Sequence, residues 1–328
     1  MTKARVFSGM QPSGRFHLGN YLGALQNWIK MQEEFECVFS IVDWHALTSQ
    51  YEETGSIKDN IHQMAIDWLS AGLDPEKGII FVQSHVKEHA ELHLLLSMIT
   101  PIGWLERVPT YKDKLQQLGD MGKEINTYGF LGYPVLQTAD IILYKAALVP
   151  VGVDQIPHLE LAREIVRRFN HLYGDVFPEP GVKLSEYPLV PGVDGRKMSK
   201  SYGNDISMSG DPEEINIKVR QMITDPQRVR KTDPGDPSIC VVYTFQKLFN
   251  QGETAEIAES CKNAAIGCVA CKKRLADKMV DHLAPVRERR ILLEQNPSLI
   301  NEILHSGAEK AREIARNTIG EAREALRL

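Results

Sequence analysis

The apolar run Ala4-Arg5-Val6-Phe7-Ser8-Gly9-Met10 leads into the turn Gln11-Pro12-Ser13-Gly14 and then into His17-Leu18-Gly19-Asn20, after which a periodic apolar segment begins near Tyr21. The run predicts a strand and the periodic segment a helix, so the whole stretch is strand, turn and helix. This arrangement points backbone N–H groups and the dipole of a helix N-terminus at a bound anion. The stretch therefore predicts an open α/β domain with an anion-binding first turn.

Strands and helices alternate through the first 195 residues. We expect strands over residues 5–10, 37–43, 78–83 and 147–153, and helices over residues 18–31, 57–71, 88–99, 130–144 and 157–169. Repeated strand and helix imply a parallel, doubly wound sheet with right-handed crossovers, as in a Rossmann-like domain. Between residues 100 and 128 the alternation is broken by prolines and charges, which indicates a segment inserted between the two halves of the sheet.

A second informative stretch is Lys197-Met198-Ser199-Lys200-Ser201, which lies between Gly195 and Gly203. A flexible backbone lets the ammonium groups move toward charge that develops on a leaving pyrophosphate, and the hydroxyls add neutral donors. Taken alone, the pentapeptide could equally be a solvated basic surface loop. Its occurrence together with the N-terminal turn favours a loop that wraps a triphosphate.

Beyond this loop the alternation stops and the chain becomes helical, with turn-rich breaks. We therefore expect two domains: a catalytic domain over residues 1–208, carrying the insertion at about residues 100–128, and a helical domain over residues 209–328. The last stretch, residues 308–326, interleaves alanine, leucine and isoleucine with charge. That pattern is typical of a terminal amphipathic helix that packs on a neighbouring element.

Composition and charge agree with this organisation. A chain of 328 residues with 43% apolar content can bury a full core in about two domains. The net charge of -5 excludes a generally basic nucleic-acid binder, but residues 196–328 carry 22 basic against 19 acidic side chains, whereas residues 1–195 carry 16 against 24. Contacts with phosphate backbone are therefore expected in the C-terminal part. No apolar run approaches the roughly 20 residues of a membrane span and the opening residues lead into a strand, so we expect a cytoplasmic protein with no membrane association.

Taken together, His17-Leu18-Gly19-Asn20 and Lys197 to Ser201 resemble the two signature motifs of class I aminoacyl-tRNA synthetases. The first motif of that family ends in a second histidine, and Asn20 stands at that position here, a variant that tryptophanyl-tRNA synthetases commonly show. The resemblance covers essentially the whole chain and is to the bacterial type. It implies that L-tryptophan and ATP with Mg²⁺ form an adenylate, that pyrophosphate is released, and that the acyl group is then transferred to tRNA(Trp).

The first step of that reaction needs no general base, because a carboxylate is already a nucleophile at neutral pH. Catalysis then reduces to alignment and to stabilisation of charge on the leaving group. By resemblance the catalytic residues are His17, Asn20, Lys114, Lys197 and Lys200, and the ATP-binding residues are Gln11, Gly19, Asn20, Gly152, Asp154, Lys197, Met198, Ser199 and Lys200. Lys114 could alternatively lie on a solvated helix face, and the turn at Gly152 to Gln155 has a purely structural interpretation as an Asx-type turn.

The choice of amino acid is expected to depend on Asp140, which lies in an otherwise apolar helical stretch where an unpaired carboxylate is costly. An indole N–H could donate to it, and phenylalanine would then be rejected because Asp140 would be left unpaired. Asp140 could equally be a capping or ion-paired residue. By resemblance the tryptophan pocket contains Phe7, Gly9, His45, Tyr133, Gln137, Asp140, Ile141, Val151 and Gln155, with Gln11 beside them. Plain core packing is the alternative for Phe7, His45, Tyr133 and Val151.

Three other functions compete with this interpretation. Tyrosyl-tRNA synthetases are similar in fold and loops, and they also place an aspartate in this region. A catalytically inactive paralogue that binds RNA is a second alternative, which the two intact signature loops disfavour. A phosphate-binding-loop NTPase is excluded because Gly9 to Gly14 continues into Arg15-Phe16 in place of Lys-Ser/Thr.

Four of the five cysteines lie in the helical part, at positions 240, 261, 268 and 271. In a cytoplasmic chain they should be reduced, so metal ligation or simple packing must account for them. Structural zinc usually draws on two close pairs, whereas here three cysteines cluster and a fourth arrives alone, which suits a [4Fe-4S] cluster better than Zn²⁺. The predicted ligands are Cys240, Cys261, Cys268 and Cys271, and Cys37 is interpreted as a small core residue.

The resemblance extends to these cysteines. Some bacterial tryptophanyl-tRNA synthetases carry a four-iron, four-sulfur cluster in this region, and the spacing of Cys261, Cys268 and Cys271 is similar to theirs. The family also implies that the helical domain binds the anticodon and that the protein is a homodimer built through the inserted segment at about residues 100–128.

Overall fold

The computed structural model describes residues 3–109, 111–112, 127–184 and 190–328. Its centre is a five-stranded sheet in the order β3-β2-β1-β4-β5, and all four strand pairs are parallel. The strands are β1 (Arg5–Met10), β2 (Glu36–Ile41), β3 (Gly78–Val82), β4 (Leu148–Val151) and β5 (Gly181–Leu184). The first strand is central and the chain order reverses beside it, which confirms the predicted doubly wound α/β domain.

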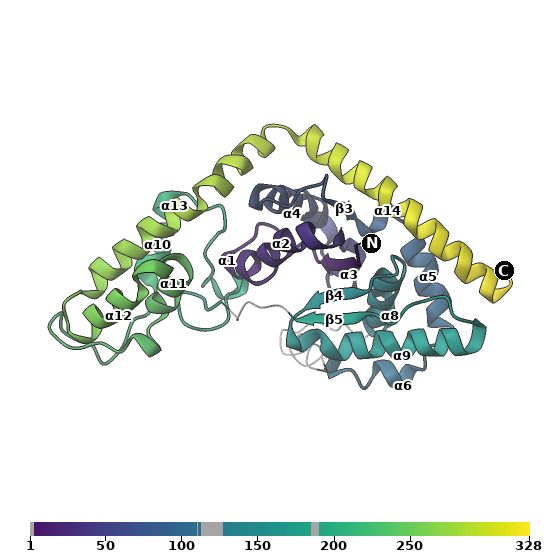
Figure 1. Cartoon of the computed structure of the whole chain (residues 1–328), viewed down its shortest axis with the longest axis horizontal. Helices are drawn as coiled ribbons and strands as arrows, with labels where there is room; N and C mark the ends of the chain where they lie inside the picture. The colour runs from purple at the N-terminus through teal and green to yellow at the C-terminus, as the bar shows by residue number, and fades with distance from the viewer. Residues whose placement is uncertain (1–2, 110, 113–126, 185–189) are drawn as a thin grey trace.

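Helices connect the strands and cover both faces of the sheet (Figure 1). They are α1 (Leu18–Asn20), the π-helical η1 (Tyr21–Leu25), α2 (Gln26–Glu34), α3 (Asp43–Gln50), η2 (Thr54–Ser56), α4 (Ile57–Ala71), η3 (Gln83–His85), α5 (Glu88–Ser97), α6 (Ile102–Leu105), α8 (Tyr128–Ile142), η4 (Val153–Gln155) and α9 (Ile156–Tyr173). The bounds of α4 are those that sequence periodicity predicted. The helix ends there because Gly72 adopts a left-handed conformation (φ 112°), which costs glycine little. The strand expected over residues 37–43 is shorter than predicted, since α3 already begins at Asp43.

The remaining described chain is helical. It contains η5 (Lys200–Tyr202), α10 (Pro212–Gln221), η6 (Pro237–Ile239), α11 (Val241–Phe249), η7 (Gln251–Glu253), α12 (Thr254–Lys262), α13 (Cys268–Glu294) and α14 (Pro297–Leu326). Among the described helices, none is long and apolar enough to cross a membrane. The predicted α/β domain followed by helices is therefore observed.

Two apolar cores lie on opposite faces of the sheet, because successive side chains of a strand point to opposite sides. On β1, Val6 belongs to the core shared with α2, α4, α10, α11 and α13. Its neighbour Phe7 belongs to the core shared with α5, α8, α9 and α14. One continuous core thus joins the helices that follow the lysine loop to the first half of the sheet.

The two longest helices span the molecule as the arms of an inverted V (Figure 1). Helix α13 packs against α10 and α11 at one end and against α4 at the other, while α14 lies along α5 and the edge strand β3. The contact with β3 is close at Gly307, where an added Cβ would lie 1.8 Å from the carbonyl oxygen of Ile80. The C-terminal helix therefore covers an edge strand that would otherwise be open to pairing.

Most of the inserted segment, including Lys114, lies outside the described residues. Within it the structure describes α6, which packs against α8.

Candidate active site

A cleft of about 620 Å³ opens at the carboxyl ends of β1 and β4, the place where an open α/β sheet binds its ligand. All nine side chains predicted for tryptophan line it: Phe7, Gly9, His45, Tyr133, Gln137, Asp140, Ile141, Val151 and Gln155. It is also lined by Gln11, Gly152, Asp154 and Lys197 from the predicted ATP-binding set. The fold therefore brings residues from both predicted groups into one cavity.

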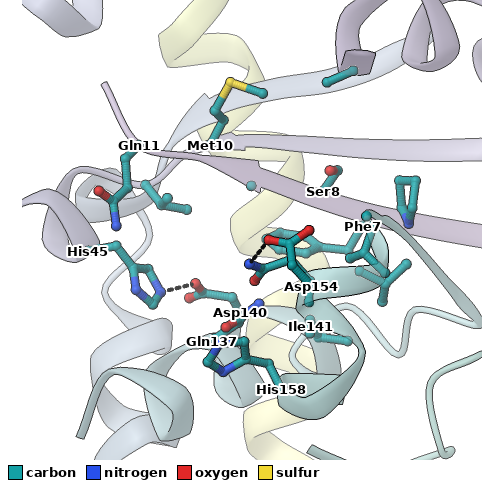
Figure 2. Close-up of a pocket in the computed structure, with 18 of the residues that line it drawn as sticks. Phe7, Ser8, Met10, Gln11, His45, Gln137, Asp140, Ile141, Asp154 and His158 are labelled. Carbon is teal, nitrogen blue, oxygen red and sulfur yellow. Dashed lines mark hydrogen bonds and ion pairs between the residues drawn. The ribbon is translucent and has the colours of Figure 1, made fainter. Parts of the chain in front are cut away.

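Asp140, from α8, is the buried carboxylate of this cleft and is 1% exposed. Its Oδ2 accepts from His45 Nε2 at 2.9 Å, and Figure 2 shows the imidazole of His45 turned toward it. Its Oδ1 bonds with His89 Nδ1 at 2.7 Å, and Gln83 Nε2 donates to both oxygens at 2.7 and 2.9 Å. The far nitrogen of His89 bonds in turn with the hydroxyl of Tyr144 at 2.7 Å. A carboxylate held in this way has a fixed plane and a fixed direction in the cleft.

The same bonds determine the charge of Asp140. Burial by itself raises the pKa of the carboxyl group, but the hydrogen bonds from His45 and His89 outweigh it and lower the pKa to about 2. Asp140 is therefore an anion at neutral pH. Because it is ionised and buried, it is a strong acceptor for an N–H group of a ligand in the cleft.

Aromatic rings form the wall of the cleft around Asp140. Phe7 stacks on Tyr144 with ring centroids 5.5 Å apart, and the ring of Tyr133 lies edge-on to that of His45 at 6.5 Å. The hydroxyl of Tyr133 bonds with Nε2 of His158, which is buried and also lines the cleft, at 3.3 Å. This end of the cleft suits a flat apolar group that carries one hydrogen-bond donor.

Asp154 and Gln155 line the cleft from η4, the short helix that follows β4. Figure 2 shows Asp154 among the side chains of the cleft. The side chains of Asp154 and Gln155 bond to each other, Gln155 Nε2 to Asp154 Oδ2, at 2.9 Å. The Asp154 carboxylate folds back so closely on Gly152 that a Cβ there would lie 2.6 Å from Oδ1. A side chain at position 152 would have to displace this carboxylate, which together with the amide of Gln155 faces polar ligand groups.

The first signature motif forms the N-terminus of the helix that follows β1. His17 is the N-cap residue of α1: its Nδ1 accepts from the Asn20 backbone N–H, and the Asn20 side chain accepts from the His17 N–H, each at 3.3 Å. This reciprocal pair is a capping box, and it fixes the orientation of both side chains at a helix start. Burial, together with the nearby Lys200, lowers the pKa of His17, so its imidazole is neutral at pH 7.

The second motif is a turn whose shape is determined largely by Asn204. Gly195 and Gly203 lie at the two ends of the loop in left-handed conformations (φ 81° and 64°), which glycine adopts without steric cost because it has no Cβ. The side chain of Asn204, 2% exposed, accepts from the Ser199 N–H at 2.8 Å and donates to Asp194 at 2.7 Å and to the Lys197 carbonyl at 3.2 Å. Sequence reasoning missed Asn204, because its importance depends on bonds that only the folded turn shows.

The two motifs are in direct contact. The Gly19 N–H donates to the sulfur of buried Met198 at 3.3 Å, and Lys200 Nζ donates to the carbonyl of Ser13 at 2.6 Å. A Cβ on Gly19 would lie 2.9 Å from the His17 ring, so glycine is required at this junction. Burial lowers the pKa of Lys200 below its ordinary value. An anionic ligand would oppose that shift, which makes the ammonium a ready partner for phosphate.

The four clustered cysteines meet in another part of the molecule, where α11, α12 and α13 pack together. Cys240 precedes α11, Cys261 lies in the last turn of α12, and Cys268 and Cys271 lie in the first turn of α13. Arg228 Nη1 lies 3.7 Å from the sulfur of Cys261, and Gln246 Nε2 lies 3.5 Å from that of Cys271. Burial raises the pKa of both of these thiols.

None of these four sulfurs belongs to a ready single-ion site. Among the described residues, no group of three or more His, Cys, Asp or Glu side chains is placed to hold a metal ion. Cys37 is buried in β2, and burial raises its pKa to about 12, which agrees with the predicted core role.

Gln83 and His89 are further functional candidates that sequence reasoning missed. Gln83 follows β3 and His89 lies in α5, whereas Asp140 lies more than 50 residues away in α8. The one available signal was position, since Gln83 stands at the carboxyl end of a strand, where ligand-site residues gather.

Comparison with known proteins gives consistent relatives. The profile of the family described as tRNA synthetases class I (W and Y) matches residues 1–284. The tryptophan–tRNA ligase of Thermotoga maritima is 49% identical over 99% of each chain, and that of Aquifex aeolicus is 45% identical over 99% of this chain and 100% of its own. The structure of tryptophanyl-tRNA synthetase from Campylobacter jejuni, complexed with ADP and tryptophan, superimposes with a TM-score of 0.90 at 36% identity, covering 99% of this chain and 100% of that one.

Proposed function

Since the chain belongs to the class I tRNA synthetases for tryptophan and tyrosine, we propose which of its residues carry out each part of the reaction. The enzyme is a tryptophan–tRNA ligase: it activates L-tryptophan with ATP and transfers the product to tRNA(Trp). The observation that carries the assignment of residues is the single cleft that has Asp140 on one wall and Lys197 on another. An amino acid and a nucleotide triphosphate can therefore meet inside it.

The tryptophan side chain is proposed to lie between Phe7, Tyr133 and Ile141, with its indole N–H donating to Asp140. Gln155 then faces the α-amino group. A tyrosine phenol has a comparable donor but a shorter, single ring, so it would reach Asp140 only by leaving part of the apolar wall unfilled. Phenylalanine lacks the donor altogether and would gain no hydrogen bond to Asp140, whose oxygens keep their bonds from His45, His89 and Gln83.

ATP is proposed to bind with its ribose at Asp154, its adenine over Gly19 and its phosphates between the two motif loops. The tryptophan carboxylate attacks the α-phosphorus, the bond from that phosphorus to the bridging oxygen breaks, and pyrophosphate leaves with the electron pair. His17, Lys197 and Lys200 are proposed to stabilise the charge that develops on it. Mg²⁺ accompanies the ATP and neutralises part of the same charge.

The decisive test is ATP–pyrophosphate exchange in the presence of tryptophan, tyrosine or phenylalanine. We expect exchange with tryptophan to exceed exchange with either competitor by at least about 100-fold in kcat/KM, as one missing or misplaced buried donor allows. His17→Ala should lower kcat while leaving the KM for tryptophan within about twofold, because its contact forms mainly in the transition state. Exchange without discrimination would contradict the role of Asp140, and no exchange at all would favour an inactive RNA-binding paralogue.

The helical part, residues 209–328, is proposed to hold the anticodon arm of the tRNA. Support comes from its charge, since residues 209–328 carry 19 basic against 18 acidic side chains whereas residues 1–195 carry 16 against 24. In Figure 1, α11 and α12 lie beside the end of α13 that is away from the sheet. The proposed setting of the reaction is the cytoplasm.

A [4Fe-4S] cluster is proposed at the cysteine corner, held by Cys240, Cys261, Cys268 and Cys271. In support, Cys261 lies at the end of α12 and Cys268 and Cys271 lie at the start of α13, and Arg228 and Gln246 offer N–H donors to the sulfurs of Cys261 and Cys271, as cluster sites commonly do. Zn²⁺ held by the same four thiols is the lesser alternative. A cubane cluster distributes its ligands over four irons, and when bound it would brace the three helices covalently.

A homodimer is proposed around α5, α6 and the start of α8. Large apolar side chains are exposed there: Leu94 at 53%, Met98 at 72%, Ile102 at 62% and Tyr128 at 69%. Large apolar side chains exposed in one region support a protein interface there. Light scattering at micromolar concentration should give twice the chain mass, and Met98→Glu should shift it to the monomer.

A further inference from the structure

A buried ion pair joins the long helix α13 to the segment that carries His17. Arg290, near the end of α13, pairs with Asp67 of α4, and the two side chains are 3% and 0% exposed. The second oxygen of Asp67 accepts from the backbone N–H of Phe16 at 2.6 Å. Asp67 and Arg290, which are 223 positions apart in the sequence, are thus joined. Through Asp67, Arg290 is connected to Phe16, the residue directly before the first signature motif.

Neighbouring groups complete this junction on both sides. Arg290 also contacts Gln63 of α4 and, at 2.9 Å, Glu294 of its own helix. Arg15, directly before Phe16, reaches Glu294 at 3.4 Å and Gln63 at 3.3 Å. Three separate segments therefore share one polar cluster: the turn after β1, helix α4 and helix α13.

The backbone of Phe16 is held from two directions. Asp67 binds its N–H, and its carbonyl accepts from the Met208 N–H at 3.0 Å, just beyond the lysine loop. The Phe16 ring is itself 1% exposed in the core. Since His17 is the next residue and its ring caps α1, a movement of Phe16 would move the imidazole.

A buried ion pair is a poor source of stability, because desolvation of both charges offsets most of their attraction. Well-packed apolar residues would hold α4 against α13 equally well, so stability alone does not require a carboxylate at position 67. What an apolar residue could not do is bind the N–H of Phe16. This bond gives the pair a role beyond holding two helices together.

We propose that Asp67 and Arg290 are positioning residues for adenylation: through the N–H of Phe16 they hold His17 where the phosphates of ATP bind. The proposal rests on the role of His17 proposed above. It gives α13 a fixed attachment beside the first signature motif, at the end of the helix opposite the cysteine corner. Neither residue touches a substrate.

The test compares kcat for tryptophan-dependent ATP–pyrophosphate exchange with KM for tryptophan, at a temperature where circular dichroism shows every variant folded. Arg290→Gln should lower kcat by about tenfold or more, since small misplacements of a reacting group can cost up to about 100-fold. The KM for tryptophan should stay within about twofold, because the Asp140 end of the cleft is unaffected. The double variant Asp67→Asn with Arg290→Gln restores a neutral hydrogen-bonded pair and should recover part of that loss.

Arg289→Gln is the matched control. Arg289 lies on the same helix and also bonds α4, donating to the Ser70 carbonyl at 2.6 Å, but it does not contact Phe16. This variant should keep kcat within about twofold. Equal losses at positions 289 and 290 would overturn the proposal and show that only the packing of α13 matters.

A double-mutant cycle between Arg290→Gln and His17→Ala tests the positioning role separately from the role of His17 itself. If the pair acts through His17, Arg290→Gln should change kcat by less than about twofold in a His17→Ala background. A full additional loss there would overturn the positioning role while leaving the role of His17 intact. If His17→Ala alone has no effect on kcat, the proposed role of His17 fails instead, and the positioning role falls with it.

Discussion

The side-chain amide of Gln83 donates to both carboxylate oxygens of Asp140, at 2.7 Å and 2.9 Å. Gln83 is fully buried, and its own carbonyl oxygen accepts from the Trp44 N–H at 3.1 Å. The amide therefore cannot rotate without breaking a bond at its other end. This fixed amide holds the plane of the carboxylate, so the direction from which Asp140 accepts a ligand donor is determined by a residue that lies behind it.

We expect Gln83→Met to raise the KM for tryptophan by about tenfold, because it removes two hydrogen bonds to a charged group, each worth about 1.5–3 kcal/mol before compensation by His45 and His89. Discrimination against phenylalanine should fall in parallel. Gln32→Met is the control: Gln32 is equally buried and bridges Asp74 by two bonds, but it lies away from the cleft. Loss of discrimination in both variants would indicate general loosening instead of a specific effect on Asp140.

The charge of Asp140 has a predictable pH dependence. Its pKa is lowered from 3.8 to about 2 in the folded chain, so the ionised form stabilises the native state fully above pH 3.8, and this contribution is lost as the pH falls through about 2. The advantage of the wild type over Asp140→Asn in free energy of unfolding should therefore shrink as the pH is lowered from about 4 to about 2 in urea titrations. An advantage that does not change over that range would mean that the partners of Asp140 do not lower its pKa.

Asn204 should matter for rate and not for amino-acid binding. Asn204→Asp keeps an acceptor for the Ser199 N–H. It also replaces the side-chain N–H of Asn204, which donates to Asp194 Oδ1 at 2.7 Å, with a carboxylate oxygen that repels Asp194. We expect kcat for exchange to fall by about tenfold or more, with the KM for tryptophan nearly unchanged, because the lysines of the loop lose their alignment. Asn170→Asp is the control, since Asn170 organises the turn after α9 in a similar way, bonding Val176 and Phe177. A rise in the KM for tryptophan at position 204 would contradict the assignment of the loop to ATP.

The contact of α14 with β3 predicts a large difference between two glycines of one helix. Gly307→Ala should destabilise the protein by at least about 3 kcal/mol, since the added Cβ meets the Ile80 carbonyl oxygen at 1.8 Å and backbone must move. Gly320→Ala meets nothing within 4 Å and should stabilise it by about 0.5–1 kcal/mol through helix propensity. Chemical denaturation checks both. Equal effects would mean that α14 does not lie on the edge strand.

Local patterns predicted the elements with strong periodicity, and the structure explains which elements were missed. The run over β1 was predicted at its observed bounds because its side chains alternate between two buried faces. By contrast, β5 spans four residues, none of them buried, and it is a strand only because it pairs with β4. No local signal in the sequence carries that pairing.

The site divides in the same way. Residues within the two motifs and the turn after β4 were found because short motifs carry their chemistry locally. Gln83, His89, Asn204 and the pair Asp67 and Arg290 were missed, because their roles arise from bonds across the fold. The cysteine spacing predicted ligands of one centre, but among the described residues no group of three or more His, Cys, Asp or Glu side chains is placed to hold a metal ion.

The cysteine corner yields the last prediction. Protein purified without oxygen should be brown and contain about four irons and four sulfides per chain. Cys268→Ser should remove most of that iron. Cys268 is the first residue of α13, so its substitution removes both a proposed ligand of the cluster and the bond that would anchor the start of the helix. Cys37→Ser is the matched control: its sulfur is buried in β2, far from the other four in the fold, and iron content should not change.

The same variant also tests what the cluster does. Because α13 is held to α4 at its other end by Arg290 and Asp67, loss of the ligand should loosen the cysteine corner without moving Phe16. Charging of tRNA(Trp) should therefore fall, while tryptophan-dependent exchange stays within about threefold of the wild type, since the adenylation cleft keeps its lining. Stoichiometric zinc in anaerobically prepared protein would replace the cluster with a structural ion. Loss of exchange in step with charging would mean that the metal supports the whole fold and not only the RNA-binding part.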